Sequence, residues 1–217
     1  MFVGHFAVAF AAKRAAPRVS LGTLFAATSL ADLLWPVFVA MGLEQVRIDP
    51  GNTAVTPLDF VSYPWSHSLM MLVVWGCLLG LVHRLLMRRN GAAILLALVV
   101  ASHWVLDYVT HRPDMPLYPG GPKYGLGLWN SVATTMIVEI AMFAAAVWLY
   151  LGATRPIGWP GQWGLASLVL ILLLSYVGNI FGPPPPSVQA LTTVAVVGGP
   201  LSVVWAAWAD RHRRVTR

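Results

Sequence analysis

Six apolar segments constrain the fold of this chain more than any other feature. Each is close to the roughly 20 residues that an α-helix needs to cross the hydrocarbon core of a bilayer. They are Leu21–Leu43, Ser66–Met87, Ala92–Val109, Leu128–Leu151, Gln162–Phe181 and Val188–Ala209. The prolines at 183–186 cannot continue a helix and therefore separate the last two segments. The sequence predicts an all-α fold, a polytopic membrane bundle of about six transmembrane helices.

Composition excludes an ordinary soluble domain. Only 10% of the 217 residues are charged and 58% are hydrophobic, whereas a soluble domain carries roughly 25% charged residues. No polar stretch is long enough to fold separately, so residues 1–217 are predicted to form a single integral membrane domain. Within it, residues 1–151 carry the candidate site and residues 152–217 add two C-terminal spans. The lone cysteine, Cys77, provides neither a disulfide nor a cysteine metal site.

The lysine and arginine residues predict the orientation of the chain. If the chain starts on the cytoplasmic side and alternates across six spans, both termini are cytoplasmic. Eleven basic residues, Arg89 and Arg217 among them, then fall inside, and only Arg47, Arg112 and Lys123 fall outside. This distribution follows the positive-inside rule. It also explains the net charge of +6 as membrane anchoring, so nucleic acid is not an expected partner.

The first twelve residues are apolar but too short to cross a bilayer. At 1.5 Å per residue they reach about 18 Å, roughly halfway. Two interpretations compete: a re-entrant half-helix anchored by Lys13 and Arg14, or a helix lying in the interface. The apolar residues surround the segment instead of forming one stripe, which favours burial. The basic residues follow this apolar stretch, so a signal peptide is not expected.

Ionisable side chains inside these segments are the strongest indication of function. An isolated charge at the bilayer centre costs at least about 2.5–3.5 kcal/mol, so such groups normally face a partner or a wet cavity. Asp32, His103 and Glu139 each lie about 11 residues into their spans, or roughly 16 Å from the end where the span begins. The others fall at comparable or slightly more outward depths, so all six could surround one cavity. The six are His5, Asp32, His67, His103, Asp107 and Glu139.

The chemistry of this set favours a divalent metal. His103, Asp107 and His111 are spaced i, i+4, i+8, which places them on one face if the helix persists to His111. Imidazole nitrogen and carboxylate oxygen both suit zinc. Together with His5, Asp32 and His67, the His103–Asp107 pair supplies enough ligands for one complete tetrahedral site and part of a second. The predicted cofactor is therefore Zn²⁺, as one or two ions.

Several further residues have competing interpretations. Glu139 is expected to handle protons and not to bind metal, because Thr135 occupies the position one turn earlier. Ser66 is a good capping residue beside His67 and a candidate substrate contact. Arg112 and Lys123 lie in a loop rich in proline and glycine, where they either bind an anionic head group or are simply solvated. The residues expected only to serve turns or to be solvated are Asp49, Asp59, Asp114, His83 and His212.

The order of these motifs also resembles a known family. Gly4-His5, Asp32, Ser66-His67-Ser68 and His103-x-x-x-Asp107 resemble the bacterial membrane-bound metal-dependent hydrolases over roughly the first 150 residues. The order is also similar to that of the zinc-dependent phospholipase C and single-strand-specific nuclease superfamily. The resemblance implies that Asp32, His67, His103 and Asp107 hold one metal and that His5 holds a second, with Asp107 bridging. Those soluble enzymes use an amino-terminal tryptophan as a ligand, whereas here Met1 precedes His5 by four residues.

The sequence therefore predicts a membrane-embedded metal-dependent hydrolase with membrane lipid as its partner. The resemblance implies a phosphoester or lipid-linked substrate. A metal-activated water would attack the substrate, with Asp107, Glu139 and His111 as catalytic candidates. The resemblance implies a bacterial cytoplasmic membrane, and the depth of the polar residues places the site toward the outer face. The main alternative is a transporter or cation pathway using Asp32, His103 and Glu139. A membrane assembly factor with a structural metal is a third interpretation, and a di-iron lipid oxidase fits less well because clustered histidines are few.

Overall fold

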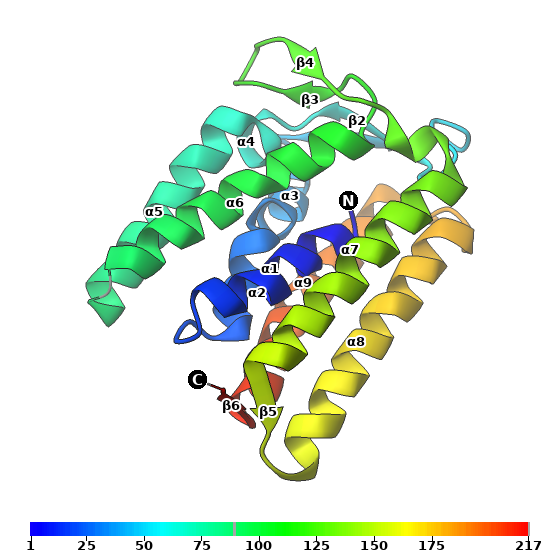
Figure 1. The fold of residues 1–217 in the computed structure, drawn as a ribbon. Helices are drawn as coiled ribbons and strands as arrows, with labels where there is room; N and C mark the ends of the chain where they lie inside the picture. The colour runs from blue at the N-terminus through cyan, green and yellow to red at the C-terminus, as the bar shows by residue number, and fades with distance from the viewer. Residues whose placement is uncertain (89, 217) are drawn as a thin grey trace.

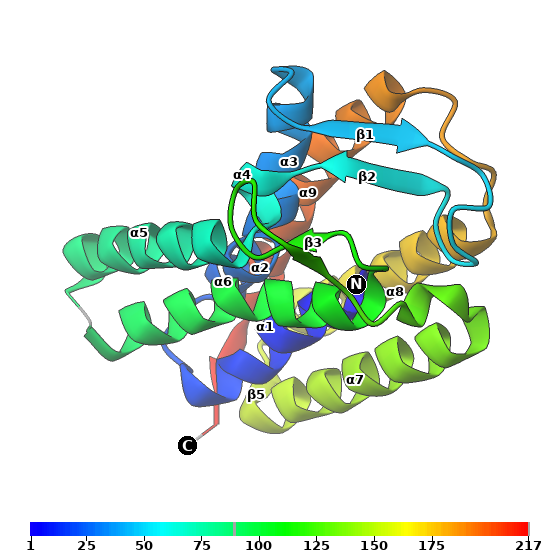
Figure 2. The same cartoon turned by 90° about the horizontal axis from the view of Figure 1, so that it is seen from above.

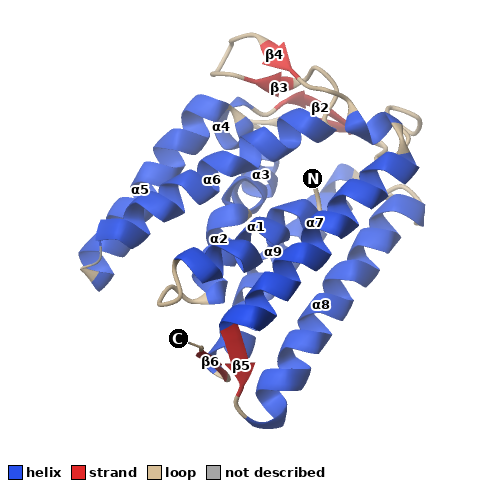
Figure 3. Cartoon of the chain, in the orientation of Figure 1, coloured by secondary structure: helices blue, strands red, loops and turns tan. Residues whose placement is uncertain are grey.

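The structure is a helical bundle with short two-stranded sheets at its ends (Figures 1 and 3). A computed structural model describes residues 1–88 and 90–216. Within this part of the chain, five helices are long and apolar enough to cross a membrane. They are α5 (Leu69–Met87), α6 (Asn90–Thr110), α7 (Val132–Ala153), α8 (Gly158–Phe181) and α9 (Val188–Arg211). These helices confirm the predicted all-α polytopic fold.

The first predicted span is a bent pair of helices, α2 (Leu21–Thr28) and α3 (Leu30–Ala40), whose axes differ by 53°. If the pair forms one span, it makes a sixth crossing. The sequence did not predict this break. The hydroxyl of Ser29 donates to the carbonyl oxygen of Phe25 at 2.6 Å, a local bond that competes with the helical ladder and favours a bend. The break places Asp32 in the first turn of α3.

The short first helix, α1 (Val3–Ala15), lies inside the bundle against α7, α2 and α6. Its buried side chains include Val3, Ala7, Ala9 and Phe10. Of the two interpretations of the first twelve residues, the structure agrees with burial. In Figure 1 the start of the chain lies within the bundle, and the C-terminal end lies at the opposite end of the molecule.

A buried ion pair holds the C-terminal end of α1. Lys13 Nζ lies 2.6 Å from Asp210 Oδ2 of α9, and both side chains are buried. The same carboxylate accepts hydrogen bonds from the Leu21 amide at 2.9 Å and from the Tyr150 hydroxyl at 2.8 Å. These bonds join α1, α2, α7 and α9, so the C-terminal spans pack within the same unit as the rest of the chain.

Short two-stranded sheets cover both ends of the bundle. At one end, β1 (Gln45–Ile48) pairs with β2 (Leu58–Ser62), and β3 (Met115–Pro116) pairs with β4 (Lys123–Tyr124). Figure 2 shows β1, β2 and β3 lying across the helices at this end. At the other end, β5 (Thr154–Pro156) pairs with β6 (Arg213–Val215). The sequence predicted only loops at both ends of the bundle. Arg89 and Arg217, which the orientation prediction counted on the cytoplasmic side, lie outside the described residues.

Candidate metal centre

Four predicted ligands converge at the break between α2 and α3. Asp32 comes from α3, His67 ends the short helix α4 (Pro64–His67), and His103 and Asp107 lie one turn apart on α6. Asp32 Oδ1 is 3.5 Å from His67 Nε2 and 3.9 Å from His103 Nε2. Asp107 Oδ2 is 3.0 Å from His103 Nε2 and 4.0 Å from His67 Nε2. Metal bonds of 2.0–2.2 Å in a tetrahedral zinc site separate the ligand atoms by about 3.3–3.6 Å. The ligand atoms of Asp32, His67 and His103 all lie within 4.8 Å of one another, so these three could hold one ion with Asp107 beside them.

Hydrogen bonds fix the orientation of both histidines. His103 Nδ1 is 2.7 Å from the carbonyl oxygen of Thr28, which can only accept, so Nδ1 carries the proton. His67 Nδ1 is 2.7 Å from Ser66 Oγ, and that hydroxyl donates its own proton to Glu44 Oε2 at 2.6 Å. His67 Nδ1 is therefore also a donor. In both rings Nε2 faces the carboxylates, and in a neutral ring it does so with its lone pair.

A nitrogen lone pair and a carboxylate that face each other repel unless a proton or a metal cation lies between them. His103 Nε2 is buried and makes no hydrogen bond within the described part of the chain, although Asp107 Oδ2 is 3.0 Å away. Metal-binding histidines almost always donate their other ring N–H to a carbonyl, carboxylate or similar acceptor. Since both histidines have this arrangement, this group of side chains could hold a divalent cation.

The other oxygen of Asp107 faces a second group. Asp107 Oδ1 is 2.9 Å from His5 Nε2, 4.0 Å from His111 Nε2, and accepts a hydrogen bond from the amino group of Met1. That amino nitrogen is 3.2 Å from His5 Nε2. The His5 and His103 rings stack in parallel with centroids 3.7 Å apart. Asp107 therefore has one oxygen in each group, as a bridging ligand would.

His111 lies just beyond the end of α6 and is held by residues of the neighbouring loops. Its Nδ1 is 3.0 Å from Asp114 Oδ1, and the hydroxyl of Tyr63 donates to the same oxygen at 2.6 Å. Burial, together with the Asp114 carboxylate, holds the pKa of Tyr63 well above its ordinary value, so the phenol stays a donor. The Trp129 ring lies against His111 at a centroid distance of 4.2 Å. Asp114 was expected only to serve a turn, and its pairing with His111 was missed.

Glu139 binds the start of α1. Its Oε2 accepts hydrogen bonds from the amides of Phe2 at 2.8 Å and Gly4 at 3.0 Å. A carboxylate at a helix N-terminus also interacts favourably with the helix dipole. Glu139 Oε1 is buried and has no partner among the described residues. Glu139 therefore positions the segment that carries His5 and leaves one oxygen free.

The three predicted substrate contacts, Ser66, Arg112 and Lys123, do not line the cavity beside the candidate ligands. Ser66 is buried, and Ser68, not Ser66, caps α5 by accepting from the Met71 amide. Arg112 donates to Asp59 and Asn52, and Lys123 donates to the carbonyl oxygen of Val61 at 3.0 Å. Neither cation lines the cavity described next. The N-cap prediction for Ser66 was wrong, because Ser66 instead links His67 to Glu44.

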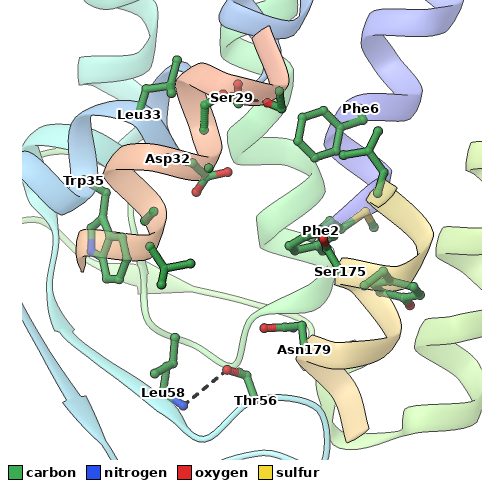
Figure 4. Close-up of a pocket in the computed structure, with 18 of the residues that line it drawn as sticks. Phe2, Phe6, Ser29, Asp32, Leu33, Trp35, Thr56, Leu58, Ser175 and Asn179 are labelled. Carbon is green, nitrogen blue, oxygen red and sulfur yellow. Dashed lines mark hydrogen bonds between the residues drawn. The ribbon is translucent and has the colours of Figure 1, made fainter. Parts of the chain in front are cut away.

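A cavity of about 560 Å³ adjoins the ligands. One side is formed by Asp32, His67, Asp107, His111 and Glu139. Figure 4 shows the Asp32 carboxylate directed into this space, opposite Phe2 and Phe6 of the N-terminal segment and Ser175 and Asn179 of α8. The Asp32 side chain is 50% exposed, whereas the other three ligands of its group are buried. A substrate could therefore approach the candidate centre from the cavity at Asp32.

Comparisons with known proteins give no assignment. No protein-family model, no curated protein and no solved structure matches this chain. The likeness of its motifs to membrane-bound metal-dependent hydrolases remains a resemblance. The support for a function therefore comes from the geometry of the candidate centre and its cavity.

Proposed function

We propose that this protein is a membrane-embedded, metal-dependent hydrolase that cleaves a phosphoester. The observation that carries the proposal is the pair of histidine Nε2 atoms, which face two carboxylates at 3.0–4.0 Å beside a cavity. A bound divalent cation, zinc by this donor set, would polarise the scissile bond and lower the pKa of a water to about 7.

The surrounding residues have separate roles in this proposal. Asp32, His67, His103 and Asp107 hold the first ion, and His5 with the second oxygen of Asp107 offers ligands for another. Since both oxygens of Asp107 face candidate ligands, His111 and Glu139 are the residues that would transfer protons during the reaction. His111 is fixed by Asp114 with Nε2 directed to the centre, and Glu139 has a free oxygen beside the cavity. Each can accept or donate a proton at the reacting group.

We place the protein in the bacterial cytoplasmic membrane with its site toward the outer face. The hairpins β1–β2 and β3–β4 adjoin the site at one end, which carries Arg47, Arg112 and Lys123. Most other basic residues belong to the connections and termini away from these hairpins. Under the positive-inside rule, the end with few basic residues faces outward.

A cation pathway is the second candidate, and one observation favours it. The bent span α2–α3 breaks beside His103, and broken helices surround the ion sites of many transporters. In that case Asp32, His103 and Glu139 would pass a cation along the cavity. The hydrolase has the stronger support because a protein acceptor holds the second nitrogen of each histidine, an arrangement typical of histidines that bind a resident metal ion.

The test is hydrolysis of bis(4-nitrophenyl) phosphate by detergent-purified protein. We expect activity that a chelator removes and added zinc restores. Asp32→Asn should lower the rate at least about 100-fold, because removing a ligand should cost no less than losing an outer partner. Asp49→Asn, at an exposed carboxylate, is the matched control. Protein that hydrolyses no phosphoester but conducts protons in liposomes would favour the pathway instead.

A further inference from the structure

The cavity extends beyond the candidate centre into an apolar cleft between α3, α8 and α9. Its far wall includes Leu168 and Leu172 of α8 together with Val194 and Leu201 of α9. None of these side chains can bind a metal or carry a proton. A small water-soluble ester would gain little binding free energy from an apolar cleft of this kind.

The cleft opens sideways through the helix faces. Three of its lining residues are strongly exposed: Val194 at 71%, Leu201 at 54% and Ile171 at 42%. All three lie within α8 and α9, which are long and apolar enough to cross a membrane. An opening at this level faces hydrocarbon, where water does not compete for the site.

Small residues on α9 make room in the cleft. Ala195, Gly198, Gly199 and Ser202 follow the i, i+3, i+4, i+7 spacing that places them on one helix face, and all four line the cavity. A Cβ at Gly198 would meet no atom within 4 Å, whereas one at Gly199 would lie 2.6 Å from Leu33 Cδ2. The cleft is therefore open beside Gly198.

Two unpartnered polar atoms lie where this cleft adjoins the centre. The hydroxyl of Tyr176 and Glu139 Oε1 are both buried, both residues line the cavity, and neither atom has a hydrogen-bond partner within the described chain. Buried polar groups normally have partners. A ligand with a polar group at the centre and a hydrocarbon part along α9 would satisfy both halves of the cavity.

We infer that α8 and α9 bind the hydrocarbon chain of a lipid phosphoester that enters from the bilayer, with its phosphate at the metal centre. This inference rests on the proposed function for its reaction, but the binding of the chain does not. It gives the two C-terminal spans a role in substrate selection, although they contribute no candidate metal ligand.

The kinetic test compares methyl and dodecyl 4-nitrophenyl phosphate, which share a leaving group and differ only in chain length. We expect wild-type protein to prefer the dodecyl ester in kcat/KM by at least about tenfold, since buried methylenes contribute to binding. Gly198→Leu fills the cleft, so it should bring the ratio of the two kcat/KM values down to about one. Gly152→Leu on α7, where an added Cβ also meets open space, is the control. Partition into micelles is the same for every variant.

A binding measurement separates the two proposals. A photoactivatable dodecyl phosphate should crosslink to α8 and α9, unlabelled dodecyl phosphate should compete while inorganic phosphate does not, and Gly198→Leu should prevent labelling. Labelling without hydrolysis would overturn the proposed function and leave this inference standing. Hydrolysis without a chain-length preference, or labelling that Gly198→Leu leaves unchanged, would overturn the inference.

Discussion

At the scale of single residues, the centre depends on side chains one step away from the ligands. Glu44 is buried, and its two oxygens accept from the amides of Trp65 and Ser66 and from the hydroxyl of Ser66. That hydroxyl in turn fixes the ring of His67. The sequence predicts the ligands, because charged and imidazole groups are rare inside apolar spans. It does not predict Glu44 or Asp114, since both lie in connecting segments where an acidic residue is ordinary.

This dependence gives a prediction for Glu44→Gln. The amide would present a donor toward Ser66 and disturb the tautomer that directs His67 Nε2 to the centre. We expect zinc affinity to fall about 10- to 100-fold, the usual effect of losing an outer partner of a metal ligand. Competition with a chromophoric chelator measures this, and Gln45→Ala, at an exposed neighbour, is the control. Unchanged affinity in Glu44→Gln would show that the Glu44–Ser66–His67 chain does not orient the ligand.

At the scale of helices, two irregular elements bring the ligands together. The half-helix α1 carries His5 into the bundle and is held by Glu139 at one end and by the Lys13–Asp210 pair at the other. The α2–α3 break turns Asp32 toward α6 and leaves the carbonyl of Thr28 bonded to His103. Length alone predicts that α1 cannot cross a bilayer. The break escapes prediction because the apolar run is continuous, and a serine at its centre is common in membrane helices that stay straight.

At the scale of the whole molecule, hydropathy predicts the long apolar helices because a bilayer requires every lipid-exposed backbone group to be paired within a helix. It cannot predict the cavity, which lies between α3, α8 and α9 and is lined by small residues of α9 such as Gly198. Nor does it predict the hairpins, because strands of two to five residues in loops carry no periodic signal.

The proposed orientation has a direct test in a Cys77→Ser background. Tyr118→Cys, at an exposed residue near the β3–β4 hairpin, should react with an impermeant maleimide on intact cells. Val215→Cys in β6 should react only after permeabilisation, since the positive-inside rule places that end in the cytoplasm. The reverse labelling pattern would turn the site toward the cytoplasm.

The central claim is that Asp32, His67, His103 and Asp107 hold a divalent cation. Elemental analysis of detergent-purified protein, dialysed after exposure to zinc, tests it most directly. We predict at least one zinc per chain, lost in His67→Ala and retained in His83→Ala, a histidine of α5 outside the centre. Wild-type protein that stays metal-free, or His67→Ala that keeps its zinc, would contradict the account.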